Sequence, residues 1–131
     1  MIRVDRLDHL VLTVRSIEET FQFYWRVLGM RPRTFDGSRW ALHFRAQKIN
    51  LHQTGREFEP KAATPTPGSA DLCFVVSTPL GEVIAHLRDC GVDVLEGPVR
   101  REGATGAMQS VYLRDPDGNL LELSNYEGQT F

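Results

Sequence analysis

The chain has 131 residues, of which 41% are hydrophobic and 24% are charged, and its formal net charge is −2. This apolar content excludes a disordered chain. The lack of a run of lysine and arginine argues against a surface that binds nucleic acid. No apolar run approaches the roughly 20 residues that a membrane span needs. We therefore expect a cytoplasmic protein that binds neither nucleic acid nor membrane.

The first elements predicted are a strand and a helix. "LDHLVLTV" (7–14) is aliphatic and β-branched, which is typical of a strand. In the following "SIEETFQFYWRVLG" the apolar residues recur at helical spacing, so that Tyr24 and Trp25 are expected in the core. Ser16 with Glu19 forms a capping box at the start, and the glycine that closes the segment ends the helix.

Three short strands are predicted next, in "MRPRTF", "RWALHF" and "KINLHQ", and the Asp-Gly pair of "FDGSR" (35–39) predicts a hairpin between the first two. Residues 54–69 show no periodicity and contain three prolines. A loop of this length inside a compact domain usually marks a functional segment or a module boundary.

The same order of elements then begins again. "ADLCFVVS" (70–77) predicts a strand, and "TPLGEVIAHLRDCG" predicts a helix with Thr78 as the N-cap and Pro79 at the first helical position. Three strands follow in "VDVLEGPVR", "QSVYLR" and "NLLELSNY", the last two joined by a "DPDG" turn. The glycine-containing segment 100–109 is either a flexible hairpin loop or a lid over a cleft.

This repetition predicts an α+β fold made of two βαβββ modules, 5–53 and 70–127, joined by the linker 54–69 within a single domain over 1–131. Each module alone is too small for a stable core, so we expect the two to pack as a pair around a curved mixed sheet. Cys73 and Cys90 lie in apolar patterns, which predicts two small hydrophobic side chains rather than a disulfide.

Side chains alternate between the two faces of a strand, and the predicted strands sort into an aliphatic face and a mixed face. The aliphatic face would receive the helices. The mixed face carries five side chains with nitrogen or oxygen donors: His9, Asn50, His52, Asp71 and Glu122. If the mixed faces meet, these donors suit a divalent metal such as Mn, Fe, Co, Ni or Zn.

Glu122 is the most demanding of these residues, because it stands among leucines in "NLLEL" and a carboxylate is costly to bury without a partner. A cation would offset that cost, and a salt bridge to Arg45, Arg100 or Arg114 is the alternative. His43 and His86 are expected at the surface or at the edge of a cleft. Tyr112 is expected either in the cleft or in the core.

Three stretches of the chain carry a family resemblance: "LDHLVLTVRSIEETFQFYWRVLGM", the linker region "INLHQTGREFEPKAATPTPGSADLCF", and "GATGAMQSVYLRDPDGNLLELSNY". The chain resembles the vicinal oxygen chelate superfamily, which includes glyoxalase I, extradiol dioxygenases and bleomycin resistance proteins, and within it the glyoxalase-domain-containing 5 type. The resemblance implies that each βαβββ unit forms half of a cup-shaped sheet with a metal at the junction. It also implies a homodimer, in which the halves of a cup come from one chain or from two.

The resemblance further implies a set of metal ligands. The family's first-strand histidine corresponds to His9, and its last-strand glutamate corresponds to Glu122. The fourth-strand ligand falls on Asn50, and His52, two residues further on, faces the same way and can replace it. The fifth-strand ligand falls on Asp71. The expected metal ligands are therefore His9, His52, Asp71 and Glu122, and Glu122 is also the expected catalytic base.

The function expected from these features is a metal-dependent enzyme, similar to a lactoylglutathione lyase, acting on a small substrate that chelates the metal through two adjacent oxygens. An Fe(II) dioxygenase that uses His9, His52 and Glu122 is one alternative. A non-enzymatic protein that sequesters a small molecule in an apolar cleft is the other. A purely structural domain would leave the inward carboxylates unexplained.

Overall fold

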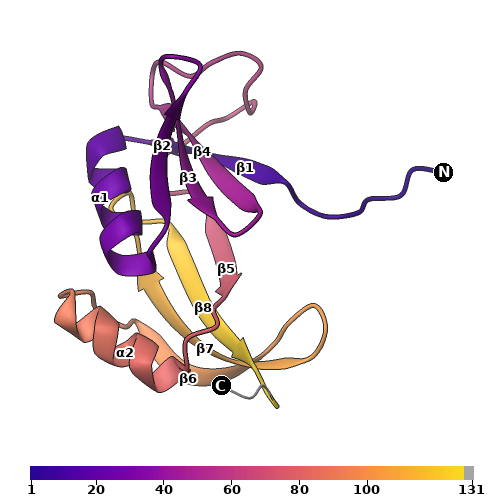
Figure 1. Ribbon diagram of the computed structural model, residues 1–131, viewed down its shortest axis with the longest axis vertical. Coiled ribbons are helices and arrows are strands. Elements are labelled where there is room, and N and C mark those ends of the chain that lie inside the picture. Colours follow the sequence, from indigo (N-terminus) through magenta and orange to yellow (C-terminus); the bar gives the residue numbers. More distant parts are fainter. Residues whose placement is uncertain (129–131) are drawn as a thin grey trace. The chain divides into compact units, whose positions relative to one another are not determined.

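The computed structural model describes residues 1–128, and its elements follow the predicted order of one strand, one helix and three strands, twice over (Figure 1). The chain divides into two compact units, Met1–Pro67 and a second that begins at Gly68. Each unit has its own four-stranded sheet and its own helix. The predicted α+β fold of two βαβββ modules is confirmed, and the division falls inside the predicted linker.

The elements of the first unit are β1 (His9–Val14), α1 (Ile17–Leu28), β2 (Arg31–Phe35), β3 (Arg39–Phe44) and β4 (Gln47–Gln53). Those of the second are β5 (Asp71–Val75), α2 (Leu80–Asp89), β6 (Glu96–Glu102), β7 (Ala107–Arg114) and β8 (Leu120–Tyr126). The sheets have the equivalent orders β1-β4-β3-β2 and β5-β8-β7-β6. In both, the first strand runs parallel to the last and the remaining pairs are antiparallel.

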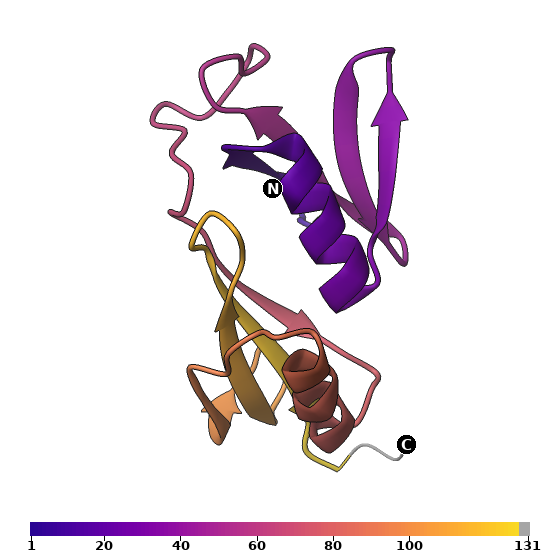
Figure 2. The same ribbon diagram turned by 90° about the vertical axis from the view of Figure 1, so that its left-hand side faces the viewer.

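Helix α1 begins and ends where the sequence predicts. The Ser16 hydroxyl accepts a hydrogen bond from the Glu19 N–H at 3.1 Å, and Gly29 ends the helix in the left-handed region with φ of 69°. The helix packs on β2, β3 and β4 (Figure 2). Tyr24 is fully buried, but Trp25 is 57% exposed, because consecutive helical residues point about 100° apart and only one of them can face the sheet.

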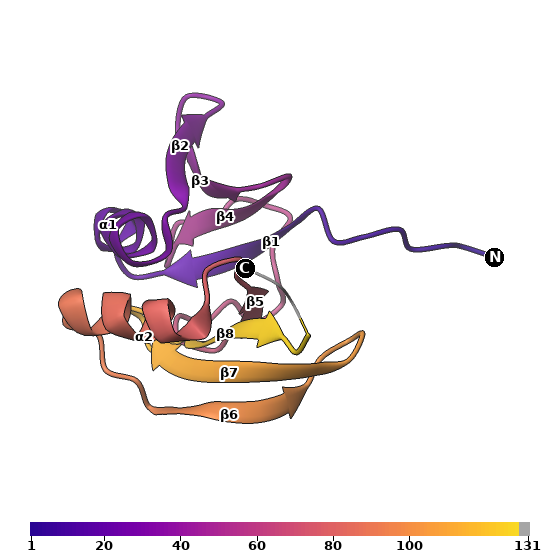
Figure 3. The same cartoon turned by 60° about the horizontal axis from the view of Figure 1, so that its bottom comes forward.

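The aliphatic faces of both sheets form cores with their helices, as predicted. Leu12, Val14, Ile49 and Leu51 are buried in the first unit. In the second unit α2 packs on β7 and β8 (Figure 3), and Val111, Leu113, Leu121 and Leu123 are buried. Among residues 1–128, no helix is both long and apolar enough to cross a bilayer.

The start of α2 differs from the prediction. The helix begins at Leu80, and Pro79 rather than Thr78 occupies the N-cap position, with no side-chain capping bond of its own. The cap comes instead from strand β8, where Asn125 Oδ1 accepts a hydrogen bond from the Leu80 N–H at 2.8 Å. Asn125 Nδ2 also donates to the carbonyl oxygens of Val76 and Thr78, both at 3.0 Å, and so fixes the approach to the helix.

The "DPDG" turn is held by buried polar groups. Asp115 Oδ1 accepts hydrogen bonds from the N–H groups of Asp117 and Asn119, each at 2.9 Å, and Asn119 Nδ2 donates to Asp115 Oδ2 at 2.8 Å. Asn119 Oδ1 in turn accepts from the Ala70 N–H at 2.9 Å. These residues therefore stabilise the turn and join it to the start of β5.

The segment 100–109 is mostly strand rather than loop. β6 continues to Glu102 and β7 begins at Ala107, which leaves Gly103–Gly106 as the connection. The Gly103 N–H donates to the Gly106 carbonyl at 2.7 Å, and the Thr105 N–H donates to the Tyr126 hydroxyl at 3.3 Å. Of the two alternatives, the structure shows a hairpin, but its strands pair almost to the tip, so that only residues 103–106 form the loop.

Candidate functional site

The mixed face of the first sheet carries the histidines that the sequence singled out. β1 and β4 pair so that His9, Val11 and Thr13 lie beside Lys48, Asn50 and His52, respectively. Paired residues of neighbouring strands share a face, so these six side chains lie on one side of the sheet. The predicted alternation along both strands is confirmed.

His9 is held by the residue that precedes it. Its Nδ1 lies 2.8 Å from Asp8 Oδ1, and its side chain is 43% exposed. This hydrogen bond is the main cause of the lowered pKa of Asp8, so that the carboxylate is charged near neutral pH. A carboxylate on one ring nitrogen is how many metal-binding histidines are oriented, with the other nitrogen left for the metal.

Asn50 has a buried oxygen without a partner. Its Oδ1 is inaccessible to solvent and accepts no hydrogen bond within the described part of the chain. An unsatisfied buried acceptor costs about 1–3 kcal/mol. Asn50 lies between Val11 of β1 and Ala41 of β3, on the same face as His9 and His52.

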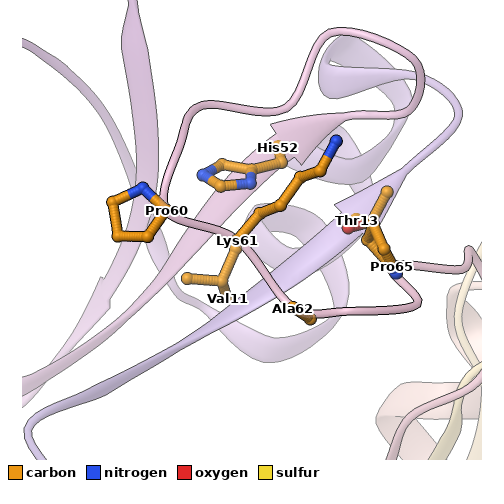
Figure 4. Close-up of a pocket in the computed structure, with 7 residues that line it drawn as sticks. All are labelled: Val11, Thr13, His52, Pro60, Lys61, Ala62 and Pro65. Carbon is orange, nitrogen blue, oxygen red and sulfur yellow. The ribbon is translucent and has the colours of Figure 1, made fainter.

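His52 borders a cavity of about 230 Å³ (Figure 4). The linker folds over the ends of β1 and β4 and forms its outer wall. The residues that line the cavity are Val11, Thr13, His52, Pro60, Lys61, Ala62 and Pro65. The aperiodic linker therefore forms part of the wall of a small cavity in the first unit.

The linker is anchored beside this cavity by Phe58. The His52 ring meets the Phe58 ring edge-on at 5.7 Å, and the Arg39 guanidinium lies 4.4 Å from the centroid of the same ring. Burial, followed by the positive charge of Arg39, lowers the pKa of His52. The imidazole is therefore neutral near pH 7, the form that can ligate a metal or accept a hydrogen bond.

The second sheet carries the two predicted carboxylates on one face. β5 and β8 pair so that Asp71, Cys73 and Val75 lie beside Leu120, Glu122 and Ser124, respectively. Asp71 is exposed and Glu122 is half-buried. Cys73 is also exposed, which corrects the expectation of a small core side chain, since it lies on the mixed face rather than the aliphatic one.

Glu122 is held by serine hydroxyls. Its Oε2 accepts hydrogen bonds from Ser110 Oγ at 2.7 Å and from Ser124 Oγ at 3.3 Å, and the two fully buried hydroxyls lie 2.6 Å apart. Cys73 Sγ lies 3.4 Å from Ser124 Oγ. Burial of the thiol raises the pKa of Cys73, and the charge of Glu122 adds to the rise, so that Cys73 is protonated near neutral pH.

Within the described residues of the second unit, no ion pair joins Glu122 to an arginine. Arg100 is paired with Glu102 and Glu127, each at 3.2 Å, and Arg114 Nη1 donates to the Gly118 carbonyl. The salt-bridge alternative for Glu122 is therefore wrong for Arg100 and Arg114, which face other partners. Arg45 belongs to the first unit, and its pairing with Glu122 stays a prediction.

Tyr112 and Arg101 complete the surroundings of Glu122, and the sequence pattern did not identify Arg101. Tyr112 lies directly opposite Glu122 on β7, and its hydroxyl accepts a hydrogen bond from Arg101 Nε at 3.0 Å. Arg101 also lies 3.3 Å from Glu96. Burial raises the pKa of Tyr112, and the charge of Glu122 raises it further. The hydrogen bond from Arg101 acts in the opposite direction and lowers it.

The predicted metal ligands are thus distributed over both units, with His9 and His52 on one sheet and Asp71 and Glu122 on the other. Within the described residues, no cluster of three or more His, Cys, Asp or Glu side chains is arranged to hold a metal. The four-residue ligand set stays a prediction. His43 is half-buried and His86 is exposed, as expected for residues at an edge or on the surface.

A sequence profile described as the Glyoxalase/Bleomycin resistance protein/Dioxygenase superfamily matches residues 6–123. The chain belongs to this superfamily. It is 58% identical over 123 residues to virulence protein STM3117 of Salmonella typhimurium, covering 94% of this chain and 85% of that protein. It is also 52% identical over 126 residues to the glyoxalase domain-containing protein RDO1 of Mycosarcoma maydis, covering 96% of this chain and 71% of the relative.

Solved structures agree with this assignment. The crystal structure of STM3117 superposes with a TM-score of 0.94 and covers 95% of this chain and 99% of that one. The structure of an integron cassette protein from Vibrio cholerae, 54% identical, has a TM-score of 0.95 and covers 97% of this chain and 99% of that one.

Two more distant relatives are named for different enzymes. A biphenyl-2,3-diol 1,2-dioxygenase of Rhodococcus globerulus is 32% identical over 126 residues, covering 90% of this chain and 62% of that protein. A lactoylglutathione lyase from Agrobacterium tumefaciens has a TM-score of 0.71 at 18% identity, over 94% and 95% of the two chains, a likeness that shows the fold alone.

Proposed function

We propose that this chain is a metal-dependent enzyme whose small substrate presents two adjacent oxygens to a divalent cation, with chemistry like that of a lactoylglutathione lyase. Its ligands would be His9, His52, Asp71 and Glu122, and the protein would act as a homodimer. The observation that carries the proposal is the half-buried carboxylate of Glu122, which two serine hydroxyls hold and no arginine neutralises within the described residues of the second unit.

The donor set fits such a cation. Imidazole nitrogens and carboxylate oxygens are the ligands that Mn, Fe, Co, Ni and Zn accept in proteins. His9 has one ring nitrogen bonded to Asp8, the arrangement that orients a ligating histidine, and His52 is held in its neutral form by its surroundings. When bound, a cation of this kind would supply Lewis acidity at the substrate oxygens.

Glu122 would move the proton. Both serine bonds reach Oε2, which leaves Oε1 to other partners and fixes the orientation of the carboxylate. A positioned carboxylate of this kind can accept a proton from a substrate carbon and return it to the neighbouring carbon. Tyr112, kept protonated by burial and lying opposite Glu122, provides a hydroxyl donor beside it.

For the fourth-strand ligand, the contacts favour different roles for the two candidates. His52 is a neutral imidazole at the wall of the cavity. Asn50 offers a carbonyl oxygen that lacks a hydrogen-bond donor, but that atom is closed off from solvent. We therefore keep His52 as the ligand and assign Asn50 to the lining of the site.

Replacing the proposed base tests this function. Glu122→Gln keeps the size and the serine contacts but removes the charge, and it should lower the metal-supported lactoylglutathione lyase activity by roughly 100-fold or more. The matched control Glu18→Gln, on the exposed side of α1, should retain activity. Cleavage of biphenyl-2,3-diol by the iron-loaded protein would support the dioxygenase alternative instead. Absence of both activities with Mn, Fe, Co, Ni and Zn would contradict an enzyme of this type.

A non-enzymatic binding protein is the second candidate, and the apolar part of the cavity lining, formed by Val11, Pro60, Ala62 and Pro65, favours it. Under this alternative, metal-free protein should bind a planar aromatic compound in the cavity. Ala62→Trp should fill the cavity and weaken that binding, whereas Ala63→Trp, the neighbouring linker residue that is not part of the lining, should not. Equal binding by both variants would exclude the cavity as the site.

A further inference from the structure

A row of basic side chains crosses the sheet of the first unit, away from the cavity but on the same face. Arg31 of β2 pairs with His43 of β3, His43 pairs with Lys48 of β4, and Lys48 lies beside His9 of β1. The row therefore has one basic residue on each of four adjacent strands. Neighbouring strands of a sheet are about 4.8 Å apart, which sets the spacing of the row. Arg33 lies on the same face of β2, two residues along from Arg31.

The arginines of this row have no acidic partner. Arg31 and Arg33 are exposed and form no ion pair with any residue in 1–128. Lys48 Nζ lies 4.3 Å from the centroid of the Phe35 ring instead of on a carboxylate. Asp8, which precedes His9 in the chain, is already bonded to the His9 ring.

His43 lies among these cations, and their charges act on its imidazole ring. It is half-buried, and its pKa is lowered first by burial and then by the charges of Arg33, Lys48 and Arg31. The ring is therefore neutral near pH 7 and offers one N–H donor. Arg31, Arg33 and Lys48 are like charges on one face of this sheet, and no ion pair within residues 1–128 offsets their repulsion, so the stability of the fold does not explain the cluster.

We propose that Arg31, Arg33, His43 and Lys48 form a binding site for an oxyanion, a carboxylate or a phosphate group of a small molecule. The two guanidinium groups supply forked N–H donors that match such a group, Lys48 supplies a point charge, and the neutral His43 ring supplies a further donor. The net charge of −2 and the confinement of the cations to one part of one sheet argue against a long polyanion such as nucleic acid. This site does not depend on a metal.

Calorimetric titration of the metal-free full chain tests the site, with inorganic phosphate and malonate as the two probes and with any chelator dialysed away beforehand. Saturable binding of either probe is expected, and the preferred probe identifies a phosphate or a carboxylate as the natural group. Arg31→Ala/Arg33→Ala should weaken the binding roughly 10- to 100-fold, since a hydrogen bond to a charged group contributes about 1.5–3 kcal/mol. The control Arg56→Ala/Arg88→Ala removes the same charge from exposed positions off this face and should bind as the wild type does.

Three results would overturn the proposal: no binding of either probe, an equal loss in both double variants, or tighter binding of a DNA oligonucleotide that strengthens with its length. Thermal denaturation checks that each variant folds. Arg31→Lys/Arg33→Lys, which keeps the charge but removes the fork, should show an intermediate affinity. Metal content measured on the same variants should be unchanged, so failure of this site and failure of the metal proposal are distinguishable.

Discussion

The Ser110 hydroxyl donates a 2.7 Å hydrogen bond to the Glu122 carboxylate diagonally across β7 and β8, where the residue directly opposite Glu122 is Tyr112. Ser110 is itself paired with Ser124, whose hydroxyl reaches the same carboxylate oxygen at 3.3 Å. A glutamate can therefore stand between leucines in this strand because Leu121 and Leu123 point to the core, while Glu122 meets two hydroxyls on the other face.

Ser110→Ala should weaken both the fold and the proposed metal site. The variant removes a hydrogen bond to a charged group, so the free energy of unfolding should fall by about 1–3 kcal/mol. Loss of a group that orients a ligand typically lowers metal affinity about 10- to 100-fold. Urea denaturation and metal titration measure the two effects. Ser77→Ala, at an exposed position, is the control, and equal behaviour of the two variants would contradict this role for Ser110.

Asn125→Ala should destabilise the second unit through α2. Asn125 makes three hydrogen bonds at the start of this helix, to Leu80, Val76 and Thr78, and their loss should lower the free energy of unfolding by about 1–3 kcal/mol. Thr78→Ala is the informative control, because no Thr78 side-chain bond caps the helix. Denaturant titration should show a large loss in the free energy of unfolding for Asn125→Ala and almost none for Thr78→Ala. A larger loss for Thr78→Ala than for Asn125→Ala would show that Thr78 is the cap.

Gly68→Ala should be far more destabilising than Gly55→Ala, although both glycines have φ of 81°. Alanine in this left-handed region costs about 1–2 kcal/mol at either position. A Cβ at Gly68 would also lie 2.5 Å from the Asp117 carbonyl oxygen, whereas a Cβ at Gly55 would meet nothing within 4 Å. Overpacking of this kind adds about 1–3 kcal/mol. Equal free energies of unfolding for the two variants would show that the backbone at Gly68 can move away.

Stability should fall as the pH drops below the ordinary histidine pKa of 6.5. The pKa of His52 is lower in the folded chain than in the unfolded one, so the unfolded chain binds the proton more readily. The stabilisation is complete above pH 6.5 and is lost as the pH falls from there toward the folded pKa. His52→Gln should flatten the dependence of the unfolding free energy on pH, and His43→Gln should do so in the same direction. A steeper dependence in either variant would contradict the assignment.

Local signals explain why so much of the fold could be predicted. The cap at Ser16, the left-handed Gly29 and the turn at Asp115 each depend on residues within a few positions of one another. The start of α2 could not be predicted in the same way, because its cap, Asn125, is 45 residues from Leu80 in the sequence.

The candidate site could be predicted only in part, for a similar reason. Alternation along the strands assigned Glu122 to the mixed face, but its partner Ser110 follows from the pairing of two strands, which alternation does not specify. The cavity beside His52 was missed because an aperiodic linker carries no signal for where it folds. The row that contains Arg31 likewise becomes visible only once β2 and β3 are paired.

The metal content of protein purified without chelators tests the central claim most directly. Elemental analysis of the wild type should find close to one divalent metal ion for each set of the four proposed ligands, which is one per chain. The variants His9→Ala and Glu122→Gln should each lose this metal. His86→Ala, an exposed histidine on α2, should keep the metal. A wild-type protein without metal after incubation with Mn, Fe, Co, Ni and Zn, or a His9→Ala/Glu122→Gln double variant that retains a full complement, would contradict the account.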